Sequence, residues 1–537
     1  MASIPAVSSA PAAEESEGHS WHPPGLFLLF FVEMWERFSY YGMRALLVLY
    51  LMESPALDHK TKYDIVNPGR GWAEGDANAL YGVYTGLAYL LPICGGIVAD
   101  RLLGTHRSMV LGGILIALGH IALAVSGLGN MGESALGMSV FIFGLATIII
   151  GTGYFKPCVS TMVGQLYKPG DPKRDGGFSI FYMGINLGAF LCAFVCGTLG
   201  QKVGWHWGFG AAAVGMIAGL IMYFIGRPKY LRGIGEPPKG AKNHLGWLFI
   251  FSLGLSALVG VLHNTGTIQS SWTGVTNFVA STGSLVSITI GSVVVLGVLA
   301  FIALQKPGDK GPVATIFIFM LFNAFFWIAF EQAGSTLNVF AEKSTDLHVP
   351  IIGWEMPSTW FQSFNAAFII LLAPVFTWLW GALGRMNPSQ PVKIGLGLLF
   401  VGLGYVPMVY AAKVNASGAL VGMIWLTMLY FIHTLGELCL SPTGLSYVTK
   451  AAPAKLVSLL MGIWFLSSFI ANLGGGLIAS QVDKIEKGEL KPFTTAIHEF
   501  GGRADYFFMF VVITISAGVV IIVLSPALKL LMRNPND

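Results

Sequence analysis

Four charged residues lie within one apolar segment near the start of the chain. Residues 26–51 are long and apolar enough to cross a membrane as a helix, yet they contain Glu33, Glu36, Arg37 and Arg44. Together with two tyrosines between them, these charges recur mostly at spacings of three and four residues, which places most of them on one helix face. A charge near the bilayer centre costs a few kcal/mol or more unless it faces a polar interior and finds partners. The segment therefore predicts a helix that lines a polar cavity or a transport pathway.

Three further charges, Lys156, Glu331 and Glu437, lie within other apolar segments. At a rise of about 1.5 Å per residue, Arg44 falls in the outer half of its helix and Glu331 slightly outward of the middle. Lys156 and Glu437 both fall in inner halves. Opposite charges at matching depths predict an outer salt bridge, Arg44–Glu331, and an inner one between the other two residues. Forming one while breaking the other would alternate access to a central cavity, whereas permanent structural pairs are the alternative interpretation.

Five aromatic residues fall in the middle of apolar segments, although tryptophans and tyrosines of an interfacial belt lie near the segment ends. They are Tyr41, Tyr84, Tyr182, Trp327 and Trp464. Each by itself suits core packing. Together with central charges of both signs, they predict a cavity for a zwitterionic and partly apolar ligand. Arg37, Arg44 and Lys156 would bind a carboxylate, and Glu437 would bind an ammonium group.

The composition is that of a multi-pass membrane protein. Of the 537 residues, 54% are hydrophobic and 11% are charged, against about 25% charged in an average soluble domain. The net charge of +4 and the absence of a basic run give no nucleic-acid signal. The sequence has no P-loop, no nucleophile elbow and no metal-spaced cysteine or histidine cluster. We therefore expect no cofactor and no metal, and an ion gradient as the energy source.

Fourteen apolar runs are long enough to span a bilayer, which takes about 20 residues. They lie near 26–51, 78–101, 108–127, 137–165, 177–200, 206–226, 244–263, 284–304, 312–341, 358–381, 392–411, 419–448, 456–480 and 505–531. An even number puts both termini on the same side. Eighteen lysines and arginines fall in the segments on the side of the termini and ten on the other, so the positive-inside rule predicts cytoplasmic termini.

The seventh and eighth runs differ from the others, because residues 244–304 contain no Asp, Glu, Lys or Arg. Without them the layout is six plus six, as in transporters built from two similar halves around a central site. The sequence predicts four parts in chain order: a disordered cytoplasmic tail (1–25), an N-terminal six-helix bundle (26–230), a linker with two accessory transmembrane helices (231–310), and a C-terminal six-helix bundle with a short tail (311–537).

Three patterns in both halves resemble those of a known family, the proton-dependent oligopeptide transporters of the major facilitator superfamily. They are Glu33-x-x-Glu36-Arg37-Phe38-x-Tyr40-Tyr41-Gly42, Phe181-Tyr182-x-x-Ile185-Asn186-x-Gly188 and Gly436-Glu437-x-x-Leu440-Ser441-Pro442-x-Gly444. Residues 95–104, Gly-Gly-Ile-Val-Ala-Asp-Arg-Leu-Leu-Gly, resemble the superfamily's loop after its second helix. The resemblance covers nearly the whole chain, and the accessory helix pair resembles the insertion of bacterial members.

The resemblance implies an all-α membrane protein with the major facilitator fold, 6+2+6 = 14 transmembrane helices in two bundles plus the accessory pair. It implies a symporter that imports di- and tripeptides with protons by alternating access. The expected partners are these peptides, protons and the lipid bilayer, with no nucleic acid. The expected location is the bacterial inner membrane, as a multi-pass monomer with both termini in the cytoplasm.

The resemblance also implies residue roles. Proton coupling would involve Glu33, Glu36, Arg37, Lys156, Glu331 and Glu437. Arg44 with Glu331, and Lys156 with Glu437, would be the outer and inner gate salt bridges. The peptide site would comprise Arg37, Tyr41, Arg44, Tyr84, Lys156, Tyr182, Asn186, Trp327, Asn365, Glu437, Ser441 and Trp464. Some animal relatives use a histidine in the second helix for protons, but residues 78–100 contain none, which leaves the carboxylates.

Two alternatives stay open at this point. A drug or nitrate carrier of the same fold would keep much of this scaffold, although the retained Glu33, Glu36 and Arg37 favour proton-coupled peptide uptake. A membrane-embedded enzyme acting on lipid or peptidoglycan precursors would need a nucleophile or a metal set, which the sequence does not contain.

Overall fold

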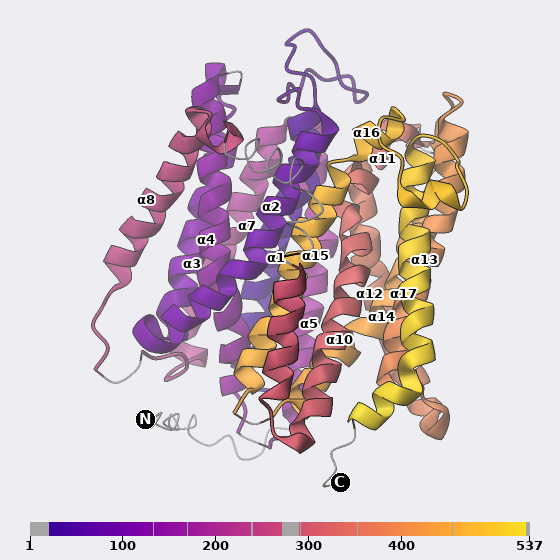
Figure 1. Ribbon diagram of the computed structural model, residues 1–537. Coiled ribbons are helices and arrows are strands. Elements are labelled where there is room, and N and C mark those ends of the chain that lie inside the picture. The colour runs from indigo at the N-terminus through magenta and orange to yellow at the C-terminus, as the bar shows by residue number, and fades with distance from the viewer. Residues whose placement is uncertain are drawn as a thin grey trace. The chain divides into compact units, whose positions relative to one another are not determined.

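The computed structural model consists mainly of long helices (Figure 1). It describes residues 21–132, 134–168, 170–237, 240–270, 289, 291–351, 353–453 and 455–532. Most of the predicted N-terminal tail, and residues 284–288 and 290 of the predicted second accessory helix (284–304), lie outside these residues. The described part contains eleven helical segments long and apolar enough to cross a membrane.

The eleven segments account for twelve of the fourteen predicted runs, because one segment, Glu74–Val125, contains two of them. The helix α1 (Pro24–Met52) is not among the eleven, since it carries the four charges noted above. A shorter apolar helix, Gly291–Ala303, lies within the predicted second accessory run. The number of fourteen spans therefore stays a prediction.

The chain divides into two compact units, and each is described by itself. The first comprises Met1–Leu46, Leu57–Asn67 and Leu90–Gly260, and the second comprises Leu47–Ala56, Pro68–Tyr89 and Val261–Asp537. The helices α1 and α2 (Glu74–Val98) each have residues in both units.

In the first unit, α3 packs against both α4 and α7. Its helices after α2 are η1 (Ala99–Leu103), α3 (Gly104–Val125), η2 (Gly129–Gly132), α4 (Ala135–Gln165), α5 (Lys173–Cys192), η3 (Ala193–Gly197), α6 (Thr198–Lys202), α7 (Trp205–Tyr230) and α8 (Leu245–Asn264). One core cluster of this unit includes Leu29, Val32, Phe155 and Tyr223. These residues are almost fully buried, so the apolar faces of α1, α4 and α7 meet in one core.

Residues 95–104, predicted to form a loop, are helical. The helix α2 continues to Val98, the π-helix η1 covers Ala99–Leu103, and α3 follows directly. Among these residues only Gly104 adopts a positive φ, +74°, where the chain enters α3. The π-helical turn and this glycine change the chain direction without a loop.

In the second unit, α13 packs closely against α14 and α17. From residue 307 on, its helices are α10 (Pro307–Phe330), η4 (Glu331–Gly334), α11 (Thr336–Ser344), η5 (Ser358–Trp360), α12 (Phe361–Ala382), η6 (Gly384–Met386), α13 (Gln390–Asn415), α14 (Ile424–Ala451), α15 (Val457–Ala479), α16 (Val482–Glu486), η7 (Phe493–Ala496) and α17 (Arg503–Met532). The core cluster is rich in aromatic residues and includes Phe319, Phe340, Tyr405 and Phe510.

In the described part of the second unit, four two-residue strands lie in loops. The strand β1 (Thr345–Asp346) pairs in parallel with β4 (Val421–Gly422), with Thr345 opposite Val421. The strand β2 (His348–Val349) pairs antiparallel with β3 (Trp354–Glu355), with His348 opposite Glu355. These short pairings tie loops together and form no extended sheet.

The predicted continuous helix 312–341 is interrupted at its charged residue. The helix α10 ends at Phe330, Glu331 begins the 3₁₀ turn η4, and Ser335 has a non-helical backbone with φ −122° and ψ −108°. The buried side chain of Gln332 holds this turn, because its Oε1 accepts bonds from Thr336 Oγ1 (2.9 Å) and Tyr506 Oη (2.8 Å). Broken helices of this kind place polar groups at the sites of many transporters.

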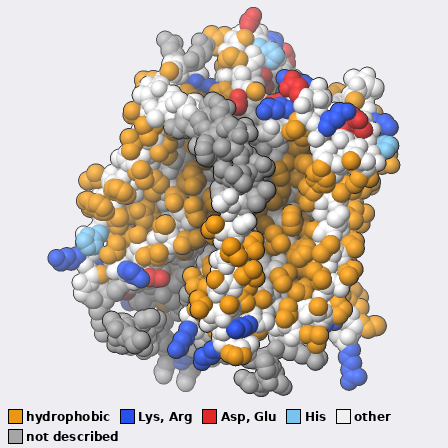
Figure 2. Space-filling model, viewed as in Figure 1, with side chains coloured by type: hydrophobic (Ala, Val, Ile, Leu, Met, Phe, Trp, Pro, Cys, Tyr) orange, Lys and Arg blue, Asp and Glu red, His pale blue; other side chains and the backbone are white. Residues whose placement is uncertain are grey.

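The outward sides of the helices are apolar in both units. Exposed large hydrophobic residues recur on α7, α8 and α17, among them Ile221, Phe251 and Val523. In the face shown in Figure 2, hydrophobic side chains follow the helices and charged ones gather near the helix ends. This distribution is typical of helices that face lipid.

Candidate functional site

The three predicted coupling residues of α1 meet in one buried group. Arg37 Nε lies 2.9 Å from Glu33 Oε1 and 2.6 Å from Glu36 Oε2. All three side chains are at most 5% exposed. The pairing of Glu33 with Arg37 follows from helix geometry, because residues four apart lie on the same face. One guanidinium thus contacts two carboxylates, and the group carries a net charge of −1 when both are ionised.

The second of the three sequence patterns, residues 181–188, brings α5 against this group. A Cβ at Gly188 would overlap the carbonyl oxygen of Met34 and lie 3.1 Å from Arg37 Cβ. Only glycine allows the two helices to approach so closely at this position. On the same helix, Asn186 is buried and its Nδ2 donates to the Tyr182 carbonyl oxygen at 3.0 Å, whereas Tyr182 is 44% exposed.

The remaining predicted cations of the first unit lie on α1 and α4. Arg44 is buried, with its guanidinium carbon 5.6 Å from the ring centroid of Tyr41, which is a cation–π arrangement. Lys156 is half-buried in α4, directly before Pro157. Tyr84 of α2 is fully buried and belongs to the second unit. The two predicted gate pairs each join residues of different units, so these pairings stay predictions.

In the second unit, α12 and α14 bring together two predicted peptide-site residues. Asn365 Nδ2 donates to Glu437 Oε2 at 2.9 Å and lies 3.1 Å from Thr434 Oγ1. Glu437 is only 7% exposed. Thr434 and Glu437 are three residues apart and share a face of α14. Thr434 was not among the predicted site residues, although its three-residue spacing from Glu437 indicated that the two share a helix face.

Two further predicted site residues lie on or against α14. Ser441 is one turn beyond Glu437, and its buried Oγ has no hydrogen-bond partner within the described part of the chain. The ring of Trp464, from α15, packs on Gly444, where an added Cβ would lie 2.5 Å from two ring carbons. Glycine at 444 therefore leaves room for the indole to pack on α14. The third sequence pattern, which includes Gly444, thus positions Trp464, 20 residues further along the chain.

Trp327 of α10 belongs to an aromatic group that also includes two phenylalanines. Its ring makes edge-to-face contacts with Phe326 (5.3 Å between centroids) and Phe330 (5.1 Å). The side chain is half-buried, and Glu331 follows one turn later in the chain. The predicted aromatic and acidic site residues of α10 therefore lie at the end of that helix, where it breaks.

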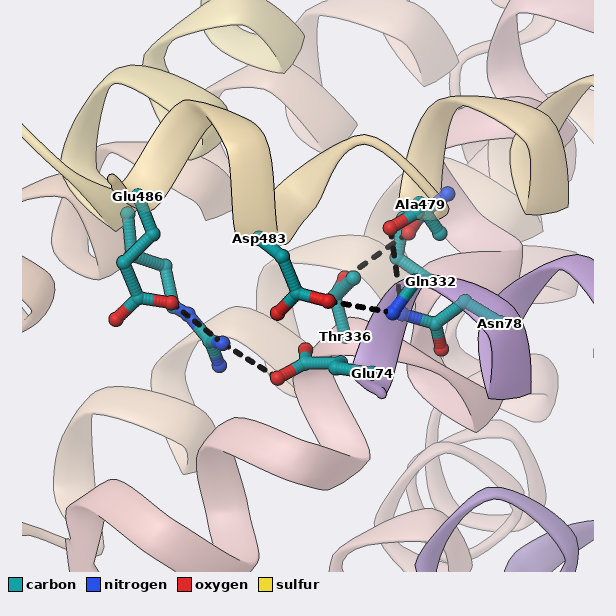
Figure 3. Close-up of polar contacts among 9 residues, drawn as sticks. Glu74, Asn78, Gln332, Thr336, Ala479, Asp483 and Glu486 are labelled. Atoms are coloured by element: carbon teal, nitrogen blue, oxygen red, sulfur yellow. Dashed lines mark hydrogen bonds and ion pairs between the residues drawn. The ribbon is translucent and has the colours of Figure 1, made fainter. Parts of the chain in front are cut away.

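A polar cluster that sequence reasoning missed joins α2 and α17 in the second unit (Figure 3). Arg503 Nη2 lies 2.6 Å from Glu74 Oε2 and 3.0 Å from Glu486 Oε2. Arg503 and Glu74 are 9% and 4% exposed, and Glu486 is half-exposed. We call these three residues the α2–α17 ion cluster. Glu74 and Arg503 are each the first residue of a helix. This position was a weak sequence signal for a polar contact between helix ends.

Two hydrogen bonds beside the ion cluster hold the same end of α2. The Gly75 amide donates to Asp483 Oδ2 at 2.8 Å, and Asn78 Nδ2 donates to the Ala479 carbonyl oxygen at 3.3 Å. A carboxylate at a helix N-terminus is favoured because it accepts from unpaired amides and opposes the helix dipole. The start of α2 is thus fixed to α15, α16 and α17.

Comparison with known proteins decides the family. A family model described as the POT family matches residues 106–495. This chain belongs to the POT family. Peptide transporter YePEPT of Yersinia enterocolitica is 38% identical over 489 residues, 88% of this chain and 90% of the relative. A di-/tripeptide transporter of Lactococcus lactis is 35% identical over 518 residues, 95% of this chain and 96% of the relative.

The crystal structure of peptide transporter POT in complex with sulfate has a TM-score of 0.77 to this POT-family chain. Its sequence is 38% identical, and the match covers 96% of this chain and 97% of that chain. The predicted all-α major facilitator fold is thereby confirmed. The protein is a multi-pass membrane transporter, and the interpretation as a membrane-embedded enzyme is wrong.

Proposed function

We propose that this POT-family chain imports di- and tripeptides together with protons by alternating access. The observation that carries the proposal is the buried Glu437 carboxylate, held by Asn365 in a second unit that also presents Trp327 and Trp464. A buried carboxylate is costly unless it is paired. The ammonium group of a peptide is a suitable partner, and the aromatic rings of the same unit suit peptide side chains.

The α1 group supplies the proton site in this proposal. Glu33 and Glu36 share the single guanidinium of Arg37, so one carboxylate charge is not balanced within the group. Binding one proton makes the group neutral, which lowers the cost of moving it within a membrane. Proton binding and peptide binding then both change the charge of buried carboxylates, which is a physical basis for coupling them.

The gates in this proposal are the two predicted salt bridges. Arg44 with Glu331 closes the outer side, and Lys156 with Glu437 closes the inner side. A peptide ammonium that pairs with Glu437 competes with Lys156 for the same carboxylate, so substrate binding weakens the inner gate. The positive groups Arg37, Arg44 and Lys156 are the candidates for binding the peptide carboxylate.

We also propose that the transporter is a monomer in the bacterial inner membrane, with both termini in the cytoplasm. The excess of lysine and arginine on the side of the termini supports this orientation. A drug or nitrate carrier of the same fold is the second interpretation. It is less favoured because Glu437 with Asn365 suits an ammonium group, which nitrate lacks.

The proposal is tested by uptake of a labelled dipeptide into proteoliposomes. We expect uptake against the dipeptide gradient when the outside is made acidic, and collapse of that uptake when a protonophore is added. Competition by di- and tripeptides, and weak competition by nitrate or single amino acids, is also expected. An absence of gradient-dependent uptake by a folded, reconstituted protein would contradict peptide symport.

A further inference from the structure

The indole of Trp327 has its single hydrogen-bond donor already occupied. Its Nε1 lies 3.1 Å from Oδ1 of Asn323, which is four residues earlier on the same face of α10. Indole nitrogen only donates, so the amide oxygen of Asn323 must face it. The exposed part of the half-buried Trp327 therefore offers ring surface to a ligand and no N–H group.

Asn323 is itself anchored by the helix that carries the other predicted site tryptophan. Its Nδ2 donates to Ser467 Oγ at 3.1 Å, and Ser467 Oγ donates to the carbonyl oxygen of Trp464 at 2.6 Å. Asn323 and Ser467 are each 2% exposed. The indole can only donate and the carbonyl can only accept. Each of these three hydrogen bonds therefore has one possible direction.

We infer that Asn323 is a positioning residue that fixes the Trp327 indole and restricts it to apolar contact with the substrate. This inference rests on the proposed peptide transport. With its N–H occupied, Trp327 does not bond a peptide carbonyl. It forms a wall of ring surface that favours peptides with apolar or aromatic side chains over peptides with small polar ones. Neither Asn323 nor Ser467 was a predicted site residue, although the four-residue spacing of Asn323 and Trp327 was visible in the sequence.

The competing interpretation is that Asn323 only joins α10 to α15. A double-mutant cycle separates the two, because it measures whether Asn323 acts through Trp327. Asn323→Leu removes the acceptor and leaves the indole donor without this partner, whereas Trp327→Phe removes the donor and keeps an aromatic ring. The measured quantity is the ratio of kcat/KM for uptake of Ala-Phe over Ala-Ser in proteoliposomes.

We expect Asn323→Leu to lower this ratio roughly five- to tenfold in the wild-type background, the size expected when a buried donor is left unpaired. In the Trp327→Phe background, the same change should alter the ratio less than about twofold, because no N–H remains to be fixed. The matched control is Asn472→Leu, since Asn472 is also a buried amide, bonded within α15 to the Ser468 carbonyl oxygen at 2.9 Å. This control should leave the ratio unchanged.

Equal effects of Asn323→Leu in both backgrounds would overturn the inference and leave peptide transport intact. A wild-type protein that takes up neither peptide would overturn the proposed function, and the inference with it. If Asn323→Leu does not fold, as judged by size-exclusion chromatography and thermal unfolding, the cycle uses Ser467→Ala, which removes the acceptor of the Asn323 amide. An unchanged ratio in Ser467→Ala would also overturn the inference.

Discussion

In α1, Arg37 carries one positive charge between two carboxylates, and this imbalance determines what the α1 group can do. Glu33 and Glu36 both contact Arg37 Nε. Loss of either carboxylate charge makes the group permanently neutral. A group that is always neutral does not need to bind a proton. The protein can then still adopt both conformations, but it cannot couple their exchange to a proton gradient.

Glu33→Gln and Glu36→Gln should therefore abolish gradient-driven uptake while peptide exchange at zero gradient is partly retained. The cavity is left in place, and only the proton site is removed. Paired uptake and counterflow assays in the same proteoliposomes measure the two activities. Driven uptake at wild-type levels in both variants would show that these carboxylates have a structural role.

Glu437 gives a second prediction at the scale of single residues. Glu437→Ala should weaken binding of peptides with a free amino terminus far more than binding of N-acetylated peptides. A charge-assisted hydrogen bond is worth roughly 1.5–3 kcal/mol, or about ten- to hundredfold in affinity. Competition binding with matched free and acetylated dipeptides measures this difference. Equal losses for the two kinds of peptide would exclude Glu437 as the ammonium site.

At the scale of elements, glycines decide how closely the helices approach one another. Gly188→Val should reduce folded yield and uptake sharply, because the added carbon atoms overlap the backbone of α1 at Met34. Overpacking of this kind costs about 1–3 kcal/mol. Gly254→Val in α8 is the control, since an added Cβ there meets no atom within 4 Å. Yield by fluorescence size-exclusion chromatography and the uptake assay compare the two variants, and similar losses in both would contradict the close contact of α5 with α1.

The α2–α17 ion cluster gives the second prediction at this scale. Arg503→Gln leaves the buried Glu74 without its cation, which for buried pairs costs about 3–5 kcal/mol. We expect a lower unfolding temperature and faster hydrogen exchange of the amides at the start of α2. The control is Lys491→Gln, because the Lys491–Glu499 pair is 61% and 52% exposed, and exposed pairs contribute little. Unchanged exchange near Gly75 in Arg503→Gln would show that the cluster does not hold α2.

At the scale of the whole molecule, the accessory segment 244–304 is set apart because its sequence contains no Asp, Glu, Lys or Arg. The helix α8 packs on the first unit through small residues, with Ser252 Oγ 3.5 Å from Tyr154 Oη, and exposes apolar side chains on its other faces. A deletion that joins the chain near Arg227 to the chain near Lys310 should lower the folded yield but keep the order of preference among peptides. A changed preference in a stably folded deletion variant would contradict this.

The sequence by itself determined what is local along the chain. Apolar run lengths indicated the membrane segments, spacings of three and four indicated that most charges of residues 33–44 share one helix face, and three short patterns indicated the family. Each of these features involves residues within a few turns of each other, or composition alone. Helix periodicity is enough to predict such neighbours.

Only the tertiary structure decided which helices meet and where they break. Asn365 contacts Glu437 from another helix, and Arg503 contacts Glu74 from 429 positions away in the chain. The predicted helix 312–341 stops at Phe330, because the buried Gln332 side chain bonds Thr336 and Tyr506 and holds a 3₁₀ turn there. These features depend on close packing of surfaces that are distant in sequence. A single chain's periodicity specifies the face of each helix but not the partner that covers it.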